Sequence, residues 1–123
     1  MNTVTVYFPS GARVLAEYAT RAEEILRGLS RRAEVPDGTG MLFDMGTVAR
    51  HRFWMRDTWV PLDMIFIDSD GTVVGVVEGA APGDPALRGV DAPSRYVLEV
   101  SAGWSGRHGV AAGQRAVVVA LPL

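Results

Sequence analysis

Alternating apolar and polar positions at the start of the chain predict a pair of strands. Residues 3–8 read TVTVYF and residues 13–18 read RVLAEY. Both stretches are rich in β-branched and aromatic residues, which favour strands. Pro9, Ser10 and Gly11 lie between them and favour a turn. The pattern therefore predicts a β-hairpin.

The periodicity then changes and predicts one helix. Thr20 and Glu23 have the spacing of a capping box, in which both side chains accept hydrogen bonds from free backbone N–H groups. Apolar residues follow at the spacing of one helical face, at Ala22, Ile25, Leu26 and Leu29. Proline and glycine in residues 35–40 end the helix.

The remainder of the chain predicts further strands. We expect them at residues 41–45, 51–55, 62–67, 72–78, 94–101 and 115–121. A turn at 68–71 joins two of them, and residues 80–93 form a loop. About eight short strands and one helix predict a mainly β (α+β) fold, an antiparallel sheet curled into a small barrel or sandwich.

The length and composition predict a single domain spanning residues 1–123. Hydrophobic residues make up 48% of the chain and charged residues 21%, as in ordinary globular domains. The net charge of −2, without a strong basic cluster, argues against nucleic acid as a partner.

Two absences from the sequence narrow the function classes. The chain has no cysteine, which excludes disulfides and thiolate chemistry. It has no apolar run long enough to cross a membrane and no signal-peptide pattern at its start. We expect a cytoplasmic protein, or an exported one if a leader has been removed.

The densest group of side chains that could bind a ligand or take part in chemistry lies at residues 53–58. Trp54, Arg56 and Thr58 place an aromatic face, a cation and a hydroxyl close together. Such a set suits a ligand carboxylate, phosphate or sugar. The structural alternative is that these residues only pack and turn the chain.

Two carboxylates, Asp63 and Glu99, lie in otherwise apolar predicted strands. A buried carboxylate needs a partner, and Arg56 is the candidate partner of Asp63, either as a structural tie or as part of a ligand clamp. If Asp63 and Glu99 converged in one cavity, they would suit acid–base catalysis.

The sequence predicts neither a metal site nor a cofactor. Four of the five methionines lie within residues 41–64, but core filling explains them better than a soft-metal site does. The two histidines, His51 and His108, lack the spacing of a zinc site.

The order of motifs resembles the family known as domain of unknown function 192, over residues 13–118. The motifs that carry the resemblance are Arg27-Gly28-Leu29, Gly40-Met41-Leu42-Phe43, Phe53-Trp54-Met55-Arg56-Asp57-Thr58, Pro61-Leu62-Asp63, Tyr96-Val97-Leu98-Glu99 and Ala102-Gly103. This chain departs from the family pattern at two places. After Gly28-Leu29 the family usually has Met, and this chain has Ser30. At positions 56 and 57 the family usually has Lys-Asn, and this chain has Arg56-Asp57. The resemblance implies a small, mostly antiparallel, barrel-like fold of bacterial and archaeal proteins, often exported, with no established reaction.

Three functions follow as hypotheses. The first is a non-catalytic module that binds a small polar or anionic ligand through Trp54, Arg56 and Thr58, with Asp63 and Glu99 orienting the clamp. The second is a small enzyme with Asp63 and Glu99 as an acid–base pair. The third is a structural module whose exposed strand edge or apolar patch meets a protein partner.

Overall fold

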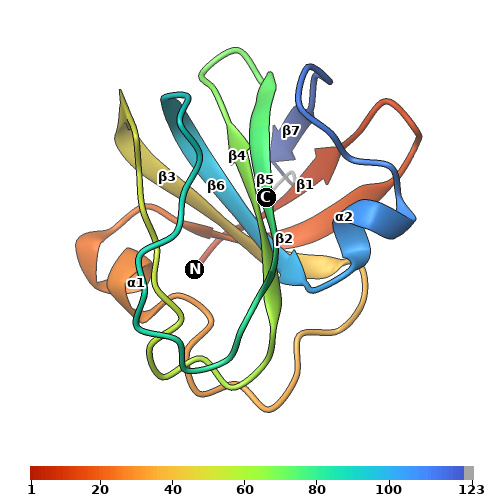
Figure 1. Ribbon diagram of the computed structural model, residues 1–123. Helices are drawn as coiled ribbons and strands as arrows, with labels where there is room; N and C mark the ends of the chain where they lie inside the picture. The colour runs from red at the N-terminus through yellow and green to blue at the C-terminus, as the bar shows by residue number, and fades with distance from the viewer. Residues whose placement is uncertain (121–123) are drawn as a thin grey trace.

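The computed structural model describes residues 1–120, and seven strands of this part form one mixed sheet (Figure 1). The strands are β1 (Thr3–Tyr7), β2 (Arg13–Ala19), β3 (Thr39–Ala49), β4 (Leu62–Ile67), β5 (Val73–Ala80), β6 (Ser94–Ser101) and β7 (Val117–Ala120). Two short helices, α1 (Ala22–Arg27) and α2 (Trp104–Arg107), accompany them. The order in the sheet is β5-β4-β6-β3-β2-β1-β7.

Both predicted hairpins are confirmed. β1 pairs antiparallel with β2, and β4 pairs antiparallel with β5 around the turn at 68–71. β6 has the predicted bounds, 94–101. β7 begins at Val117, two residues later than predicted, and the last predicted strand position, 121, lies outside the described residues.

The prediction of a purely antiparallel sheet is wrong at one place. β2 and β3 pair in parallel, because the chain crosses over through α1 between them. The sheet is curled but open, so the closed barrel or sandwich is not seen. Residues 113–116 approach the start of β5, where Val73 accepts a hydrogen bond from Gly113 N at 2.8 Å.

The predicted eighth strand, 51–55, does not form. Only Phe53 bridges, to Arg88, and the neighbouring backbone groups bond to a loop instead of a strand. The side chains still alternate: Met55 is buried, while Trp54 and Arg56 are exposed. The alternation that suggested a strand is therefore real, but the segment has no strand to pair with along its length.

The helix α1 is shorter than predicted, and α2 was not predicted. At the start of α1, Glu24 rather than Glu23 caps the backbone, accepting hydrogen bonds from Thr20 N at 3.2 Å and Arg21 N at 3.1 Å. No residue of α1 is buried, and Leu26 is 79% exposed. Ile25 of α1 and Leu29, just beyond it, still pack against a core, so the predicted apolar stripe is buried only in part.

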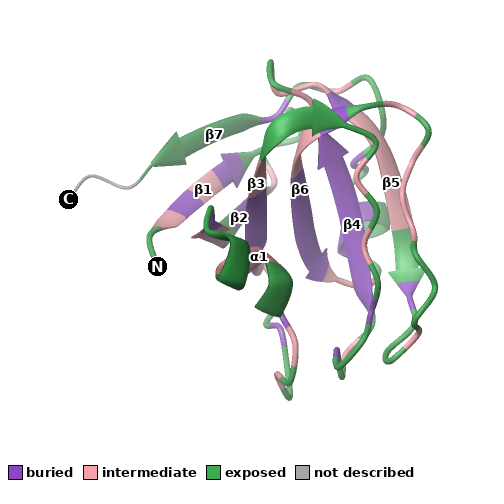
Figure 2. Cartoon of the chain, turned by 90° about the vertical axis from the view of Figure 1, so that its left-hand side faces the viewer, coloured by how far each residue is buried: buried purple, intermediate pink, exposed green. Residues whose placement is uncertain are grey.

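The sheet separates two apolar cores, and β4 contributes to both. All six residues of β4 are buried (Figure 2). Ile65 and Ile67 belong to one core with Trp104 of α2, whereas Met64 and Phe66 belong to the other. This division follows from the alternation of side chains along a strand.

Asp63 is fully buried, and backbone groups satisfy its carboxylate. One oxygen, Oδ1, accepts a hydrogen bond from Gly79 N at 2.9 Å. The other, Oδ2, accepts from Gly103 N at 3.1 Å and from Ser105 N at 3.0 Å. Asp63 thereby ties the end of β5 and the start of α2 to β4.

Replacing Asp63 by Asn tests this tie. The side-chain amide of Asn has one acceptor oxygen in place of two. Its NH₂ group would therefore face at least one of the backbone N–H donors that now bond to Asp63, and two donors cannot hydrogen-bond each other. We expect Asp63→Asn to lower the free energy of unfolding by about 1–3 kcal/mol, measured by urea denaturation.

Asp91→Asn is the matched control, because Asp91 is exposed and its side chain makes no hydrogen bond within residues 1–120. It should change stability by less than about 0.5 kcal/mol. Equal stability of the two variants would contradict the structural role of Asp63.

Candidate functional site

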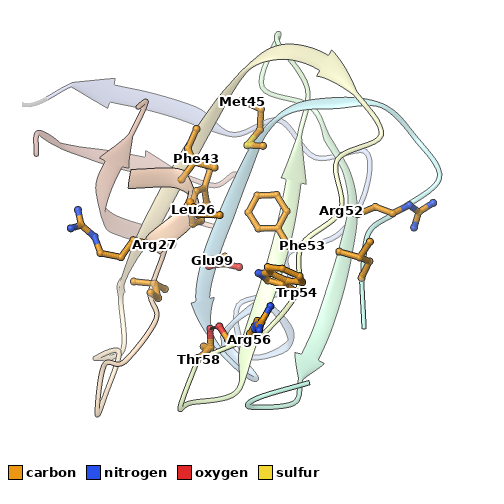
Figure 3. A pocket seen from close by; sticks show the side chains of 14 residues that line it. Leu26, Arg27, Phe43, Met45, Arg52, Phe53, Trp54, Arg56, Thr58 and Glu99 are labelled. Carbon is orange, nitrogen blue, oxygen red and sulfur yellow. Dashed lines mark hydrogen bonds between the residues drawn. The ribbon is translucent and has the colours of Figure 1, made fainter. Parts of the chain in front are cut away.

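A cavity of about 260 Å³ lies between α1 and the segment 52–58, against β3 and β6 (Figure 3). Most of its lining side chains are apolar, and the charged ones are three arginines and one glutamate. The lining residues are Ile25, Leu26, Arg27, Gly28, Leu29, Phe43, Met45, Arg52, Phe53, Trp54, Arg56, Thr58, Leu87 and Glu99. The volume suits a small ligand.

Gly28 sets the position of the first wall, α1. Its backbone has φ +49°, and its N–H donates to Glu24 O at 2.9 Å, which closes the helix end. A Cβ at this position would lie 3.3 Å from Cζ of Phe43. The glycine therefore lets the chain leave α1 close to an aromatic ring of the sheet.

The second wall, residues 52–58, is held by the loop that follows β5. Phe53 exchanges two backbone hydrogen bonds of 2.8 Å with Arg88, and Met55 N donates to Asp84 O at 2.9 Å. Gly83 N bonds to the carbonyls of Met55 at 3.1 Å and Thr58 at 3.0 Å. These bonds fix the backbone that carries Trp54 and Arg56.

Asp57 joins the two walls. Its carbonyl accepts a hydrogen bond of 2.8 Å from the backbone N–H of Arg31, just beyond α1. Its φ of +57° lies in the left-handed region, which Asp and Asn tolerate better than most residues. A backbone role explains the choice of residue here without any ligand.

Trp54, Arg56 and Thr58 lie together on the second wall (Figure 3). The guanidinium carbon of Arg56 is 5.3 Å from the centroid of the Trp54 ring, in a cation–π contact. The Thr58 hydroxyl is directed to the carbonyl of Arg56 at 3.4 Å. Within residues 1–120, no carboxylate pairs with Arg56, so its charge is available to a ligand.

Glu99 lies in the middle of the cavity wall formed by the sheet. It is 4% exposed, and its neighbours across β6 are Met41 and Met64. No group of the described residues hydrogen-bonds its carboxyl. Burial disfavours the charged form and raises the pKa of Glu99 to about 8.

Asp63 does not share this cavity. In the pairing of β4 with β6, Asp63 is opposite Val100, and Met64 is opposite Glu99. Asp63 and Glu99 therefore point to opposite faces of the sheet. The hypothesis that they converge as an acid–base pair is wrong, and so is the expected pairing of Asp63 with Arg56, since backbone amides hold Asp63.

The sequence analysis missed the apolar mouth of the cavity. Leu26 is 79% exposed, Leu87 62% and Trp54 43%. Leu26 was predicted to face a core, and Leu87 was in a loop without a pattern. Arg27 and Arg52 also line the site, although their side chains extend outward in Figure 3. No sequence pattern distinguishes these residues, because their exposure depends on how α1 and the loop after β5 pack on the sheet.

A second hollow of about 340 Å³ lies near β7, and two of its polar side chains, Tyr18 and Arg115, already have carboxylate partners. Tyr18 donates its hydroxyl proton to Asp44 at 2.9 Å, and burial with this hydrogen bond raises the pKa of Tyr18 to about 12. Arg115 lies 3.6 Å from Asp70. The cavity beside Glu99 is therefore the stronger candidate.

Comparison with known proteins identifies the family. The model of the family DUF192, described as "Uncharacterized ACR", matches residues 5–118. The chain belongs to the DUF192 family. No curated protein matches it. Among residues 1–120, no helix of this DUF192 protein is long and apolar enough to cross a membrane, and no three His, Asp or Glu side chains gather as metal ligands.

Two solved structures share the fold. A protein from Sinorhizobium meliloti 1021, described as a candidate transcription regulator, is 36% identical, with a TM-score of 0.87 over 95% of this chain and 92% of that chain. A protein of unknown function from Novosphingobium aromaticivorans DSM 12444 is 34% identical, with a TM-score of 0.84 over 94% of this chain and 83% of that chain. These similarities establish the fold and leave the activity open.

The burial of Glu99 predicts a pH-dependent stability. Between its ordinary pKa of 4.5 and the raised value of about 8, the folded protein holds a proton at Glu99 that the unfolded chain has released. The free energy of unfolding therefore falls as pH rises through this range. Glu99→Gln has no carboxyl to ionise at this position. Its free energy of unfolding, relative to that of the wild type, should therefore rise by on the order of a few kcal/mol from pH 5 to pH 8.

Urea denaturation at a series of pH values measures this difference. Glu34→Gln is the control, because Glu34 is exposed and its variant should follow the wild type. A difference between Glu99→Gln and the wild type that does not change with pH would show that Glu99 is ionised in the folded protein.

Proposed function

We propose that this DUF192 protein is a non-catalytic module that binds a small amphipathic anion in the cavity between α1 and residues 52–58. The observation that carries the proposal is the combination of an exposed apolar mouth with a cation with which no carboxylate of residues 1–120 pairs. Leu26, Leu87 and Trp54 offer apolar surface to solvent, and Arg56 offers a positive charge beside it. An apolar body bearing a carboxylate complements both features.

The placement of the anionic group follows from Arg56 and Thr58. The guanidinium lies against the Trp54 ring, which limits its freedom before a ligand arrives and reduces the entropic cost of binding. The Thr58 hydroxyl lines the same cavity and becomes a second donor when it turns away from the Arg56 carbonyl, which it reaches at 3.4 Å. The apolar part of the ligand then lies toward Phe43 and Phe53, whose rings are 5.1 Å apart edge to face.

The arginine pattern supports an anionic rather than a cationic ligand. Six of the twelve arginines form ion pairs within residues 1–120. The three that line the cavity, Arg27, Arg52 and Arg56, are not among these six. Their summed field favours a negative ligand, and Glu99 contributes little opposing charge while it is protonated.

Catalysis by an acid–base pair is not proposed, because the sheet separates Asp63 from Glu99. A nucleic-acid partner, which the description of the Sinorhizobium meliloti relative suggests, is not proposed either. The net charge of this chain is −2, and half of its arginines are paired with carboxylates.

Binding of 4-phenylbutanoate tests the proposal. This probe has one aromatic ring and one carboxylate, and its affinity is measured by calorimetric or NMR titration. We expect Arg56→Ala to weaken binding by at least about tenfold, because it removes a charge-assisted hydrogen bond. The melting temperature should change little, since Arg56 is exposed.

Two controls isolate the charge of Arg56. Arg13→Ala removes an exposed arginine that lies outside the cavity and should leave the affinity unchanged. The uncharged analogue 4-phenylbutan-1-ol should bind wild type and Arg56→Ala equally. No saturable binding of 4-phenylbutanoate, or equal binding by Arg56→Ala, would count against the proposed function.

A further inference from the structure

Glu99 is the buried titratable group that the anion-binding role of Arg56 does not use. It is 4% exposed and lines the cavity, so its small exposed surface faces the space where a ligand would lie. No hydrogen bond reaches its carboxyl from residues 1–120. A buried polar group without a partner is costly, and it gains most from a ligand that supplies one.

The groups around Glu99 do not stabilise its charged form. Met41 of β3 and Met64 of β4 flank it across the sheet, and Phe43 and Phe53 line the same cavity. The charged residues that line the cavity with Glu99 are Arg27 from α1 and Arg52 and Arg56 from the second wall, and the side chains of Arg27 and Arg52 extend outward. None of the three lies within ion-pair distance of the Glu99 carboxyl.

The surroundings therefore favour a neutral carboxylic acid at Glu99. Desolvation raises the pKa of Glu99 to about 8, so the acid is mostly protonated at neutral pH. A protonated carboxyl has one O–H donor and retains acceptor oxygens. The cavity thus presents a cation at Arg56 and an uncharged donor in the apolar wall formed by the sheet.

We propose that Glu99 is a specificity-determining residue that donates a hydrogen bond to an uncharged oxygen in the apolar part of the ligand. The ligand class is then small carboxylic acids that carry a ketone or similar acceptor on the hydrophobic portion, away from the carboxylate. This inference rests on the proposed function, because Arg56 must hold the carboxylate. A site built to hydrogen-bond one ligand group discriminates against an analogue that lacks it.

Two probes of the same skeleton isolate this contact. 4-Oxo-4-phenylbutanoate carries a ketone next to the ring, and 4-phenylbutanoate has a methylene there. At pH 6 the wild-type protein should bind the keto acid about tenfold more tightly, as one hydrogen bond to an otherwise unpaired buried group predicts. Glu99→Gln retains an N–H donor and should keep this preference.

Glu99→Met is the matched loss-of-donor variant, because methionine fits beside Met41 and Met64. It should bind both acids with equal affinity, and a thermal melt confirms that it is folded. At pH 9 the wild type should lose the keto preference as Glu99 ionises, whereas Glu99→Gln should keep it. The arginines and both probe carboxylates stay charged at both pH values, so they do not produce this difference.

The outcomes separate the two proposals. If neither acid binds the wild type, the proposed function fails and this inference fails with it. If both acids bind equally in an Arg56-dependent way, the function stands and the role of Glu99 is overturned. Tighter binding of 4-phenylbutylamine than of either acid, lost in Glu99→Gln, would also overturn it, because Glu99 would then act as a carboxylate toward a cation.

Discussion

The alternation of side chains along β4 and β6 is the constraint on which the rest of the structure depends. It places two buried carboxylates on opposite faces of one sheet, although their strands are hydrogen-bonded neighbours. Three backbone N–H groups satisfy Asp63, which serves the fold. Glu99 faces the other side without such partners and lines a cavity. The same type of side chain is therefore held by backbone amides on one face and lines a cavity on the other.

The outer wall of the cavity is anchored through the backbone and by Ile25 and Leu29, which pack against the core on that face of the sheet. α1 has six residues, none of them buried, and a helix of this length is not stable by itself. The glycine turn at Gly28 and the Arg31–Asp57 hydrogen bond hold it over the sheet. Leu26 then remains exposed and adds apolar surface at the mouth of the cavity.

Local patterns predicted the local structure. The hairpins β1–β2 and β4–β5 follow from alternation and turn residues that lie within a few positions of each other. The parallel pairing of β2 with β3 depends on where α1 crosses, which no short pattern encodes. The strand expected at 51–55 does not form, because strand pairing again depends on distant residues. Its side chains alternate as predicted, but the residues that bond to its backbone form a loop.

The candidate site likewise has a part that the local sequence predicts and a part that depends on strand pairing. Trp54, Arg56 and Thr58 are close in sequence, and the structure brings them to one cavity with Glu99. The position of Asp63 depends on the register of β4 against β6, and a shift of one residue would have exchanged the two faces. Sequence reasoning recognised that a carboxylate in an apolar strand needs a partner. It could not show that the partners are backbone amides from two distant segments.

A crystal structure with 4-phenylbutanoate bound tests the central claim most directly. The account predicts electron density for the probe between α1 and residues 52–58, with its carboxylate at Arg56 and its ring toward Phe53. An empty cavity at saturating probe concentration, or density only elsewhere on the protein, would contradict the assignment of this cavity as the ligand site.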